Sequence, residues 1–275
     1  TERLRKFYQD FYWPNNATLI LVGDFNKEEA LKKIDRFFSA IPKSEKPIND
    51  IYTFEPKQEG ERRFTVKRGA EVPRLSIGFR SPQAVHHDQY ALGIIESVLG
   101  NASKRSSRLY KALIDTGLAS YVGAYSSVYK DPGLFVVSAQ ANVGGDLKQI
   151  ESIINKELDR LKKEPISKEE LDRAKKSIVN GILTGMDDPM SLCFQFTEAV
   201  GIGSWQFWVD YPKNIEKVTA EDVQKAAQKY FVVDSSTVGY YYPQPETKEA
   251  VEKAPDPVAA VETPSQPETK PGTIS

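Results

Sequence analysis

The sequence contains few residues of the kinds that bind metals or act as nucleophiles. Its two histidines are adjacent, at His86 and His87, and its single cysteine is Cys193. Neighbouring residues on a helix point about 100° apart, so these two imidazoles do not chelate one ion as an i, i+4 pair does. They fall at the start of a predicted helix, where an exposed pair is the expectation. Cys193 lies in the apolar stretch SLCFQF, which indicates a buried structural thiol. We therefore expect no metal ligand and no catalytic residue in this chain.

Common catalytic and nucleotide-binding motifs are missing from the 275 residues. No HxxEH, HxxxH, CxxC, GxxxxGK[ST] or GxGxxG occurs. A Ser-His-Asp triad would have to use His86 or His87, and no other residue pattern supports one. The sequence thus argues against a nucleotide-binding enzyme and against a serine peptidase.

One stretch, NASKRSSRLYKALIDTGLASYVGAYSSVYKDPGLF at 101–135, concentrates groups suited to holding a peptide. Three basic residues open a predicted helix and three tyrosines follow on a predicted strand: Lys104, Arg105, Arg108, Tyr121, Tyr125 and Tyr129. Guanidinium groups and phenols bind peptide carbonyls and carboxylates. The alternative is a solvated helix end followed by strand aromatics that pack on their neighbours. Both interpretations stay open at this point.

The elements that would position this stretch follow from the apolar periodicity and the turn residues. We predict helices at 1–12, after Asn26 to before Pro42, and at 86–99, 106–116, 146–163, 167–185, 189–217 and 219–230. Strands are predicted at 18–22, 62–68, 74–80, 119–129, 134–143 and 236–242. Capping boxes are expected at Asn26 with Glu29 and at Ser167 with Glu170. This order, without strict alternation, predicts an α+β fold: a mainly antiparallel sheet with helices packed on one face.

The composition of the chain limits the kinds of partner that it can bind. The formal net charge is −1, from 37 basic and 38 acidic residues, so no global field favours nucleic acid or an anionic membrane. No run approaches the roughly 18 apolar residues of a membrane span. Hydrophobic residues make up 40% of the chain, which is enough for a packed core. We expect neither a nucleic-acid partner nor a membrane span.

The two ends of the chain resemble each other. A shift of 219 residues places FYWPNNATLILVGDF (11–25) on YFVVDSSTVGYYYPQ (230–244) without a gap. Four identities accompany the shared pattern of helix, aromatic pair, polar turn and β-branched strand: Glu2 with Glu221, Lys6 with Lys225, Gln9 with Gln228, and Thr18 with Thr237. The repeat is domain-sized, so it indicates a duplicated domain and not a solenoid.

The repeat sets the expected domain organisation. Residues 1–44 are predicted to be the C-terminal end of a first domain, 45–61 a linker, 62–243 a complete second domain and 244–275 a disordered tail. The tail has no aromatic residue and contains QPETK twice, a composition that cannot offset the entropy of ordering. Because the first copy lacks a counterpart of 62–219, we expect the chain to be the back part of a longer protein.

Three stretches together resemble the insulinase/pitrilysin-type (M16) zinc peptidases, a family that includes the mitochondrial processing peptidase and core subunits of the cytochrome bc complex. They are FYWPNNATLILVGDF followed by ALKKIDRFF, SSRLYKALIDTGLASYV followed by DPGLF, and VTAEDVQKAAQKYF. The resemblance covers most of residues 1–243. It implies two homologous α+β domains in one chain, of which this sequence holds the second.

The resemblance also implies where the chemistry lies. In this family an HxxEH motif on the first domain binds zinc and activates water, and the second domain is the non-catalytic half that helps to bind an extended peptide. Zinc is therefore expected in the missing N-terminal half and no cofactor in this chain. Some members use an Arg and a Tyr in an LRxxxGLxY-like segment. Here Ser120 falls at the Tyr position, so Arg108 and Tyr121 are the candidate substrate-binding pair.

Two functional interpretations remain. In the first, the chain is the C-terminal, substrate-chamber half of an M16-type zinc metalloendopeptidase, partnered by its own N-terminal catalytic domain and acting on peptides. In the second, it is a non-catalytic or structural M16-like subunit that pairs with a separate catalytic chain, a dimer included. An unrelated α+β binding domain is a third alternative. The resemblance favours the bacterial periplasm as the compartment.

Overall fold

The computed structural model describes residues 1–48, 55–69, 72–100 and 104–244. The predicted disordered tail, apart from Gln244, lies outside the described residues, as do the middle of the predicted linker and residues 101–103.

A five-stranded sheet forms the centre of residues 62–243, in the order β1-β5-β2-β4-β3. The strands are β1 (Arg62–Arg68), β2 (Arg74–Ser81), β3 (Ala119–Ser126), β4 (Gly133–Ala141) and β5 (Ser236–Pro243). The β1–β5 pair is parallel and the other pairs are antiparallel. A bulge between Ala119 and Tyr121 shifts the register of β3 against β4. The mainly antiparallel sheet predicted from the sequence is confirmed.

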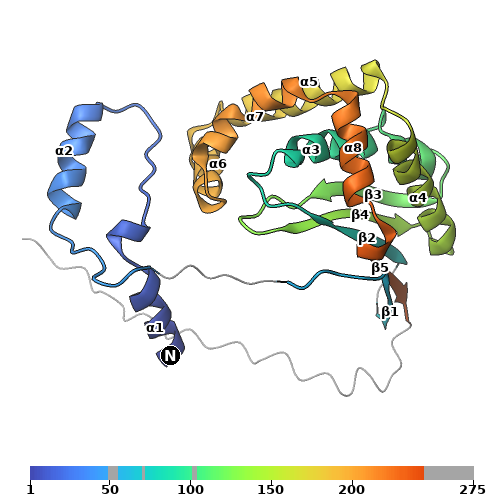
Figure 1. The fold of residues 1–275 in the computed structure, drawn as a ribbon, viewed down its shortest axis with the longest axis horizontal. Helices are drawn as coiled ribbons and strands as arrows, with labels where there is room; N and C mark the ends of the chain where they lie inside the picture. The colour runs from blue at the N-terminus through green and yellow to red at the C-terminus, as the bar shows by residue number, and fades with distance from the viewer. Residues whose placement is uncertain (49–54, 70–71, 101–103, 245–275) are drawn as a thin grey trace, which may run out of the picture.

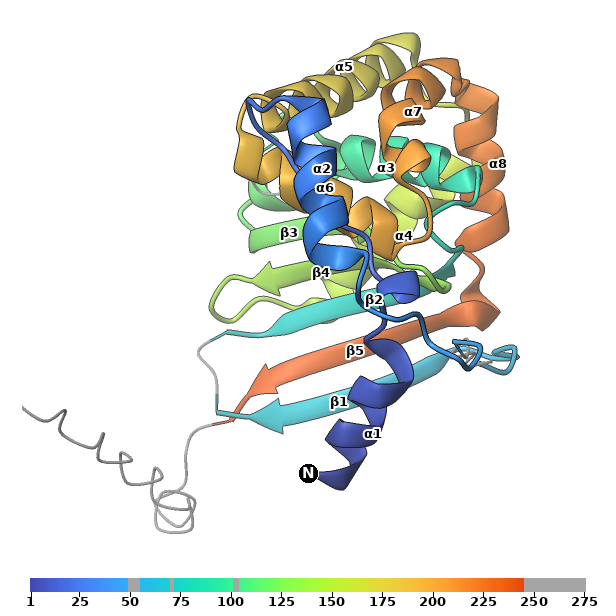
Figure 2. The ribbon, with the colours of Figure 1, turned by 90° about the vertical axis from the view of Figure 1, so that its left-hand side faces the viewer.

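The helices of this domain cover one face of the sheet (Figure 1). In Figure 2 the opposite face carries no helix from the described part of residues 62–243. The helices that follow β2 are α3 (Asp88–Leu99), the π-helix η2 (Tyr110–Ile114), α4 (Leu147–Lys163), α5 (Lys168–Gly185), α6 (Pro189–Gly201), α7 (Trp205–Lys217) and α8 (Ala220–Tyr230). None of the helices in the described part of the chain has the length and apolar character needed to cross a membrane.

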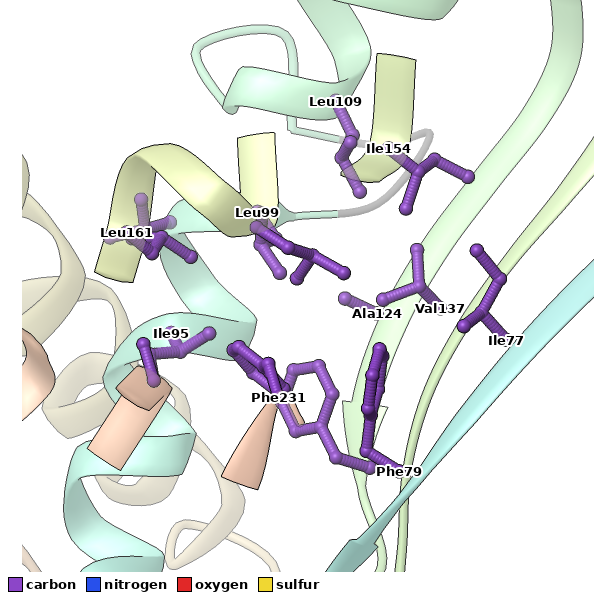
Figure 3. Packing of buried hydrophobic residues seen from close by; sticks show 14 of the residues in the cluster. Ile77, Phe79, Ile95, Leu99, Leu109, Ala124, Val137, Ile154, Leu161 and Phe231 are labelled. Carbon is purple, nitrogen blue, oxygen red and sulfur yellow. The ribbon is translucent and has the colours of Figure 1, made fainter. Parts of the chain in front are cut away.

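The hydrophobic core lies between the sheet and α3, α4 and α8 (Figure 3). Alternate residues of β2 and β4, such as Ile77 and Val137, face the helices and are buried. Phe231, at the end of α8, packs its ring against Phe79 and Phe135, with centroids 5.1 and 5.0 Å away. The alternation on the strands therefore determines which face receives the helices.

Side-chain caps fix the helix starts where the sequence predicts them. Ser167 and Glu170 form a reciprocal capping box at α5, and Thr219 with Asp222 does the same at α8. The side chain of Asn26 accepts a hydrogen bond from the Glu29 amide at 3.0 Å, which caps α2 (Lys27–Phe38) without the reciprocal bond of the predicted capping box. These local pairings explain why the predicted helix starts lie close to the observed ones.

Several predicted elements are wrong, interrupted or shorter than expected. The strand predicted at 119–129 ends at Ser126, and the helix predicted at 189–217 is divided into α6 and α7. Residues 18–22 form no strand, although their β-branched pattern predicts one. A strand needs a neighbour to take its backbone hydrogen bonds, and no described strand of this chain lies beside this segment. The helix predicted at 106–116 is reduced to the short π-helix η2, which ends before Gly117 at a φ of +73°.

The N-terminal elements contribute nothing to this core. Helix α1 (Glu2–Phe11) and helix α2 contain no buried residue. Apolar side chains on and beside them are about half exposed or more: Leu4, Phe7, Tyr8, Tyr12, Leu19, Leu21, Phe25, Phe37 and Phe38. Both helices are amphipathic, and among the described residues their apolar faces have no packing partner of the kind that such faces normally have.

Candidate functional site

Arg108 lies on the helix side of the sheet and forms a bidentate ion pair. Its Nε and Nη2 donate to the two carboxylate oxygens of Glu170 in α5, each at 2.8 Å. Its Nη1 lies 3.8 Å from Glu157 in α4, and its side chain is only 10% exposed. The guanidinium therefore ties the segment before η2 to α4 and α5, a role that leaves it little freedom to reach a peptide.

The ion pair of Arg108 with Glu170 makes the stability of the fold depend on pH in the acid range. The Arg108 guanidinium holds the pKa of Glu170 below its ordinary value of 4.5, against the opposing effect of burial. A carboxyl with a depressed folded-state pKa adds stability that is present above the unfolded pKa and is lost as pH falls through the folded value. Glu170 thus stabilises the fold at neutral pH and loses this contribution under acid.

We expect Glu170→Gln, which imitates the protonated acid, to lower the free energy of unfolding at pH 7 by about 1–3 kcal/mol. The difference from wild type should shrink as pH falls from about 5 toward 3, because wild-type Glu170 then gains its proton as well. Urea unfolding of both proteins across this range measures it. A difference that stays constant with pH would contradict the assignment of the effect to this carboxyl.

Tyr121 lies on the opposite, open face of the sheet. In β3 the side chains of Val122 and Ala124 are buried beneath the helices, whereas Tyr121 and Tyr125 are about half exposed. The hydroxyl of Tyr121 lies over Gly123, where a Cβ would meet it at 2.6 Å. The glycine therefore leaves room for the phenol to lie along the strand.

A pocket of about 520 Å³ occupies this open face near Tyr125. Strands β2, β4 and β5 form its floor through residues such as Gly78, Val136 and Thr237. Tyr125, Tyr129, Leu134, Arg62 and Arg80 also line it. Arg80 donates to the Pro56 carbonyl at 3.1 Å and pairs with Glu55 at the same distance. Aromatic, apolar and basic groups together suit an extended peptide.

The structure places the two candidate residues on opposite faces of the sheet. Arg108 contacts α4 and α5, and Tyr121 faces away from them, so they do not form one clamp. The sequence interpretation missed Arg80 and Leu134, which share the open face with Tyr125. The alternation of polar residues along β2 could have predicted that Arg80 lies on the open face, because every second residue of a strand points to the same face.

His86, His87 and Asp88 form a cluster with donor atoms close enough to hold a metal ion. The Asp88 carboxylate is already engaged, since Lys229 Nζ and the Tyr230 hydroxyl both lie 2.6 Å from its Oδ2. The lysine ammonium opposes a second cation there, and His86 Nδ1 accepts the Asp88 amide hydrogen. These residues do not fit a zinc centre.

Two expectations about polar side chains need correction. Cys193 is half-buried instead of buried, because α6 lies outside the core and buries only Ala199. His87 is exposed as expected, but its neighbour His86 is half-buried, and the two rings stack with centroids 4.4 Å apart.

Comparison with known proteins identifies the family to which this sequence is similar. Residues 1–178 match a family model described as the peptidase M16 inactive domain. The zinc protease PqqE of Helicobacter pylori is 27% identical over 243 residues, which cover 87% of this chain and 54% of that protein.

Solved structures of similar proteins have the same fold. A protease from Helicobacter pylori superposes with a TM-score of 0.82 at 26% identity, covering 88% of this chain and 59% of that one. The peptidase M16 inactive domain from Pseudomonas fluorescens shares the fold, with a TM-score of 0.71 at 21% identity over 90% of this chain and 58% of that one. The chain thus spans a little over half the length of these relatives.

Proposed function

This chain belongs to the peptidase M16 family, and on that premise we propose that it is the non-catalytic, peptide-binding half of a zinc endopeptidase. The match of residues 1–178 to the family's inactive domain carries the proposal. The resemblance found in the sequence and the predicted α+β fold are both confirmed. The relatives extend well beyond the length of this chain, so the activity of the whole protein belongs to the proposal.

The absence of HxxEH from the sequence supports a non-catalytic role for these 275 residues. Only two histidines occur, they are adjacent, and their shared neighbour Asp88 already binds Lys229. We propose that the zinc and the hydrolytic chemistry belong to a partner, either a preceding N-terminal domain of the same protein or a separate catalytic chain.

We propose the open face of the sheet as the surface that contributes to substrate binding. Tyr121 and Tyr125 present their rings there, and the adjoining pocket adds Arg80 and a floor that includes Gly78, Val136 and Thr237. Phenol hydroxyls and a guanidinium can bind the carbonyls of an extended peptide, while the rings cover its side chains. In this proposal Arg108 acts indirectly, by fixing the segment that leads into β3.

The partner surface is proposed from the internal repeat. The 219-residue shift places Tyr12 on Phe231 and Leu19 on Val238. In the second copy both counterparts are buried at 2% exposure, whereas Tyr12 and Leu19 are 63% and 54% exposed. The two segments therefore share one apolar pattern, but only the segment at 231–238 packs against a hydrophobic core, whereas the segment at 12–19 is exposed.

We infer that residues 1–44 complete a preceding domain of the same fold. The segment at 18–22 would then pair as β5 does in the second domain, which explains why a strand-forming sequence has no strand here. An apolar groove of about 460 Å³ beside α2, lined by Leu21, Phe25 and Phe38 among others, would be covered in that assembly.

The chain alone should bind no stoichiometric zinc and cleave no peptide. Elemental analysis after dialysis against zinc, together with an assay on unstructured peptides, measures both. The same assay on the chain combined with its HxxEH-bearing half is the positive control. About one tightly held zinc per chain would contradict the proposal.

The intact mass and N-terminal sequence of the native protein separate the two partner arrangements. A heavier protein with HxxEH upstream supports the single-chain peptidase. A protein that begins near Thr1 and copurifies with an HxxEH-bearing chain supports the non-catalytic subunit, including its dimeric form. Cell fractionation tests the periplasmic location that we propose from the family's bacterial members.

A further inference from the structure

A second pocket, of about 460 Å³, lies on the helix side of the sheet, between the end of α3, the turn at 104–107 and α5. Three cations line it: Lys104, Arg105 and Arg173. Four serine hydroxyls share its wall, from Ser97, Ser106, Ser107 and Ser177. It is distinct from the pocket on the open face, which has none of these residues in its wall.

The positive charge of this pocket is not neutralised from within. Its one acidic residue, Glu170, gives both oxygens to Arg108. No ion pair holds Arg105 or Arg173 among the described residues, and Lys104 only donates to Ser97 Oγ, at 3.4 Å. Glu96 of α3 lies near Lys104, but it is not part of the wall, and its carboxylate accepts the Ser126 amide hydrogen.

Ser107 gives an independent indication. It is buried, at 4% exposure, and its Oγ has no hydrogen-bond partner in the described part of the chain. Buried hydroxyls nearly always have a partner, so an unsatisfied one in the wall of a pocket calls for an explanation. The Oγ packs against Gly100, where an added Cβ would lie 2.3 Å from it, so rotation of the Ser107 side chain would be needed to present it to an acceptor oxygen of a ligand. The three cations would balance the charge of that ligand.

We propose that this pocket binds a compact oxyanion. Guanidinium and ammonium groups with hydroxyl donors suit a carboxylate or a phosphate equally. Resting on the proposed function, the oxyanion is a carboxylate of a bound peptide, its C-terminus or an acidic side chain. Free inorganic phosphate has the same chemistry, and the experiment below separates the two sources.

The test uses the full 275-residue chain and amide chemical shifts at low ionic strength, where contacts to exposed charges are least screened. It is titrated with phosphate against chloride, and with an acetylated eight-residue Gly/Ser/Ala peptide whose C-terminus is either free or amidated. We expect saturable shifts at Ser106, Ser107 and Ala174 with phosphate and with the free peptide. The amidated peptide should bind about five- to tenfold more weakly, as expected for loss of a charge-assisted contact.

Variants assign the effect to the pocket. Arg105→Gln with Arg173→Gln should reduce oxyanion binding about tenfold or more. Ser107→Ala should weaken binding without lowering the melting temperature, because it removes a hydroxyl that has no partner in the fold. Lys176→Gln is the control for the loss of one positive charge, since Lys176 is exposed on α5 and does not line the pocket, and it should leave binding unchanged.

The outcomes separate this inference from the proposed function. Equal responses to phosphate and chloride, or binding that survives the double arginine variant, would overturn the oxyanion site. Free and amidated peptides that bind equally at the open sheet face would overturn it as well while supporting peptide binding. Phosphate binding without any peptide binding would support the pocket as a small-anion site and count against the peptide role.

Discussion

Replacing Phe231 by alanine should lower the free energy of unfolding by about 3–5 kcal/mol. The side chain is 2% exposed and its ring packs against Phe79, which Figure 3 labels, and against Phe135. Truncation removes buried apolar surface and two aromatic contacts, and it leaves a cavity where α8 meets the sheet. Urea unfolding followed by circular dichroism measures the loss.

The internal repeat supplies a matched control for this prediction. Tyr12 occupies the position equivalent to Phe231 but is 63% exposed and stacks mainly on Tyr8. Tyr12→Ala should therefore change the stability of this chain by no more than about 0.5 kcal/mol. In a protein that includes the preceding domain, the same substitution should cost as much as a core truncation. Equal, small effects in both proteins would argue against the proposed docking of residues 1–44.

Replacing Arg108 by alanine should destabilise the fold by about 2–4 kcal/mol. The substitution leaves Glu170, which is largely shielded from water, without its bidentate partner. It also removes the side chain that joins the segment before η2 to α4 and α5. The expected cost is below that of a fully buried pair because water still reaches part of Glu170.

Arg105→Ala is the control for this substitution, since it removes the same charge three residues earlier from an exposed position and should have little effect on stability. The double variant Arg108→Ala with Glu170→Ala isolates the pair, and its cost should fall short of the sum of the single costs. Strict additivity would show that the two residues stabilise the fold separately. A stable Arg108→Ala protein with weakened peptide binding would instead favour the direct substrate-binding role.

Local sequence patterns were sufficient for most elements of the second domain. Alternating apolar positions along 74–80 predicted the strand β2, in which alternate residues are buried, and the turn KDPG predicted the pairing of β3 with β4. The capping box of Ser167 with Glu170 marked the start of α5, because both partners lie within one helical turn. Each of these features depends on residues close together in the chain, so it can be recognised without the fold.

Features that depend on distant partners could not be derived in this way. From the sequence, Arg108 was a candidate to bind a ligand. In the structure its guanidinium binds Glu170, which lies 62 residues away in the sequence. Tyr121 was placed correctly on a strand, but which face it takes depends on the bulge after Ala119.

The sequence by itself determined the fold class, the repeat and the family, because each can be recognised from apolar periodicity, helix caps and local motifs. It also showed the lack of an HxxEH motif in these residues. The tertiary structure alone decided that Arg108 and Tyr121 lie on opposite faces, that the cations near Ser107 share one pocket, and that residues 18–22 stay unpaired. The physical reason is the same in each case: ion pairs, pockets and sheet ladders join residues that are remote in sequence, and burial decides which of these contacts form.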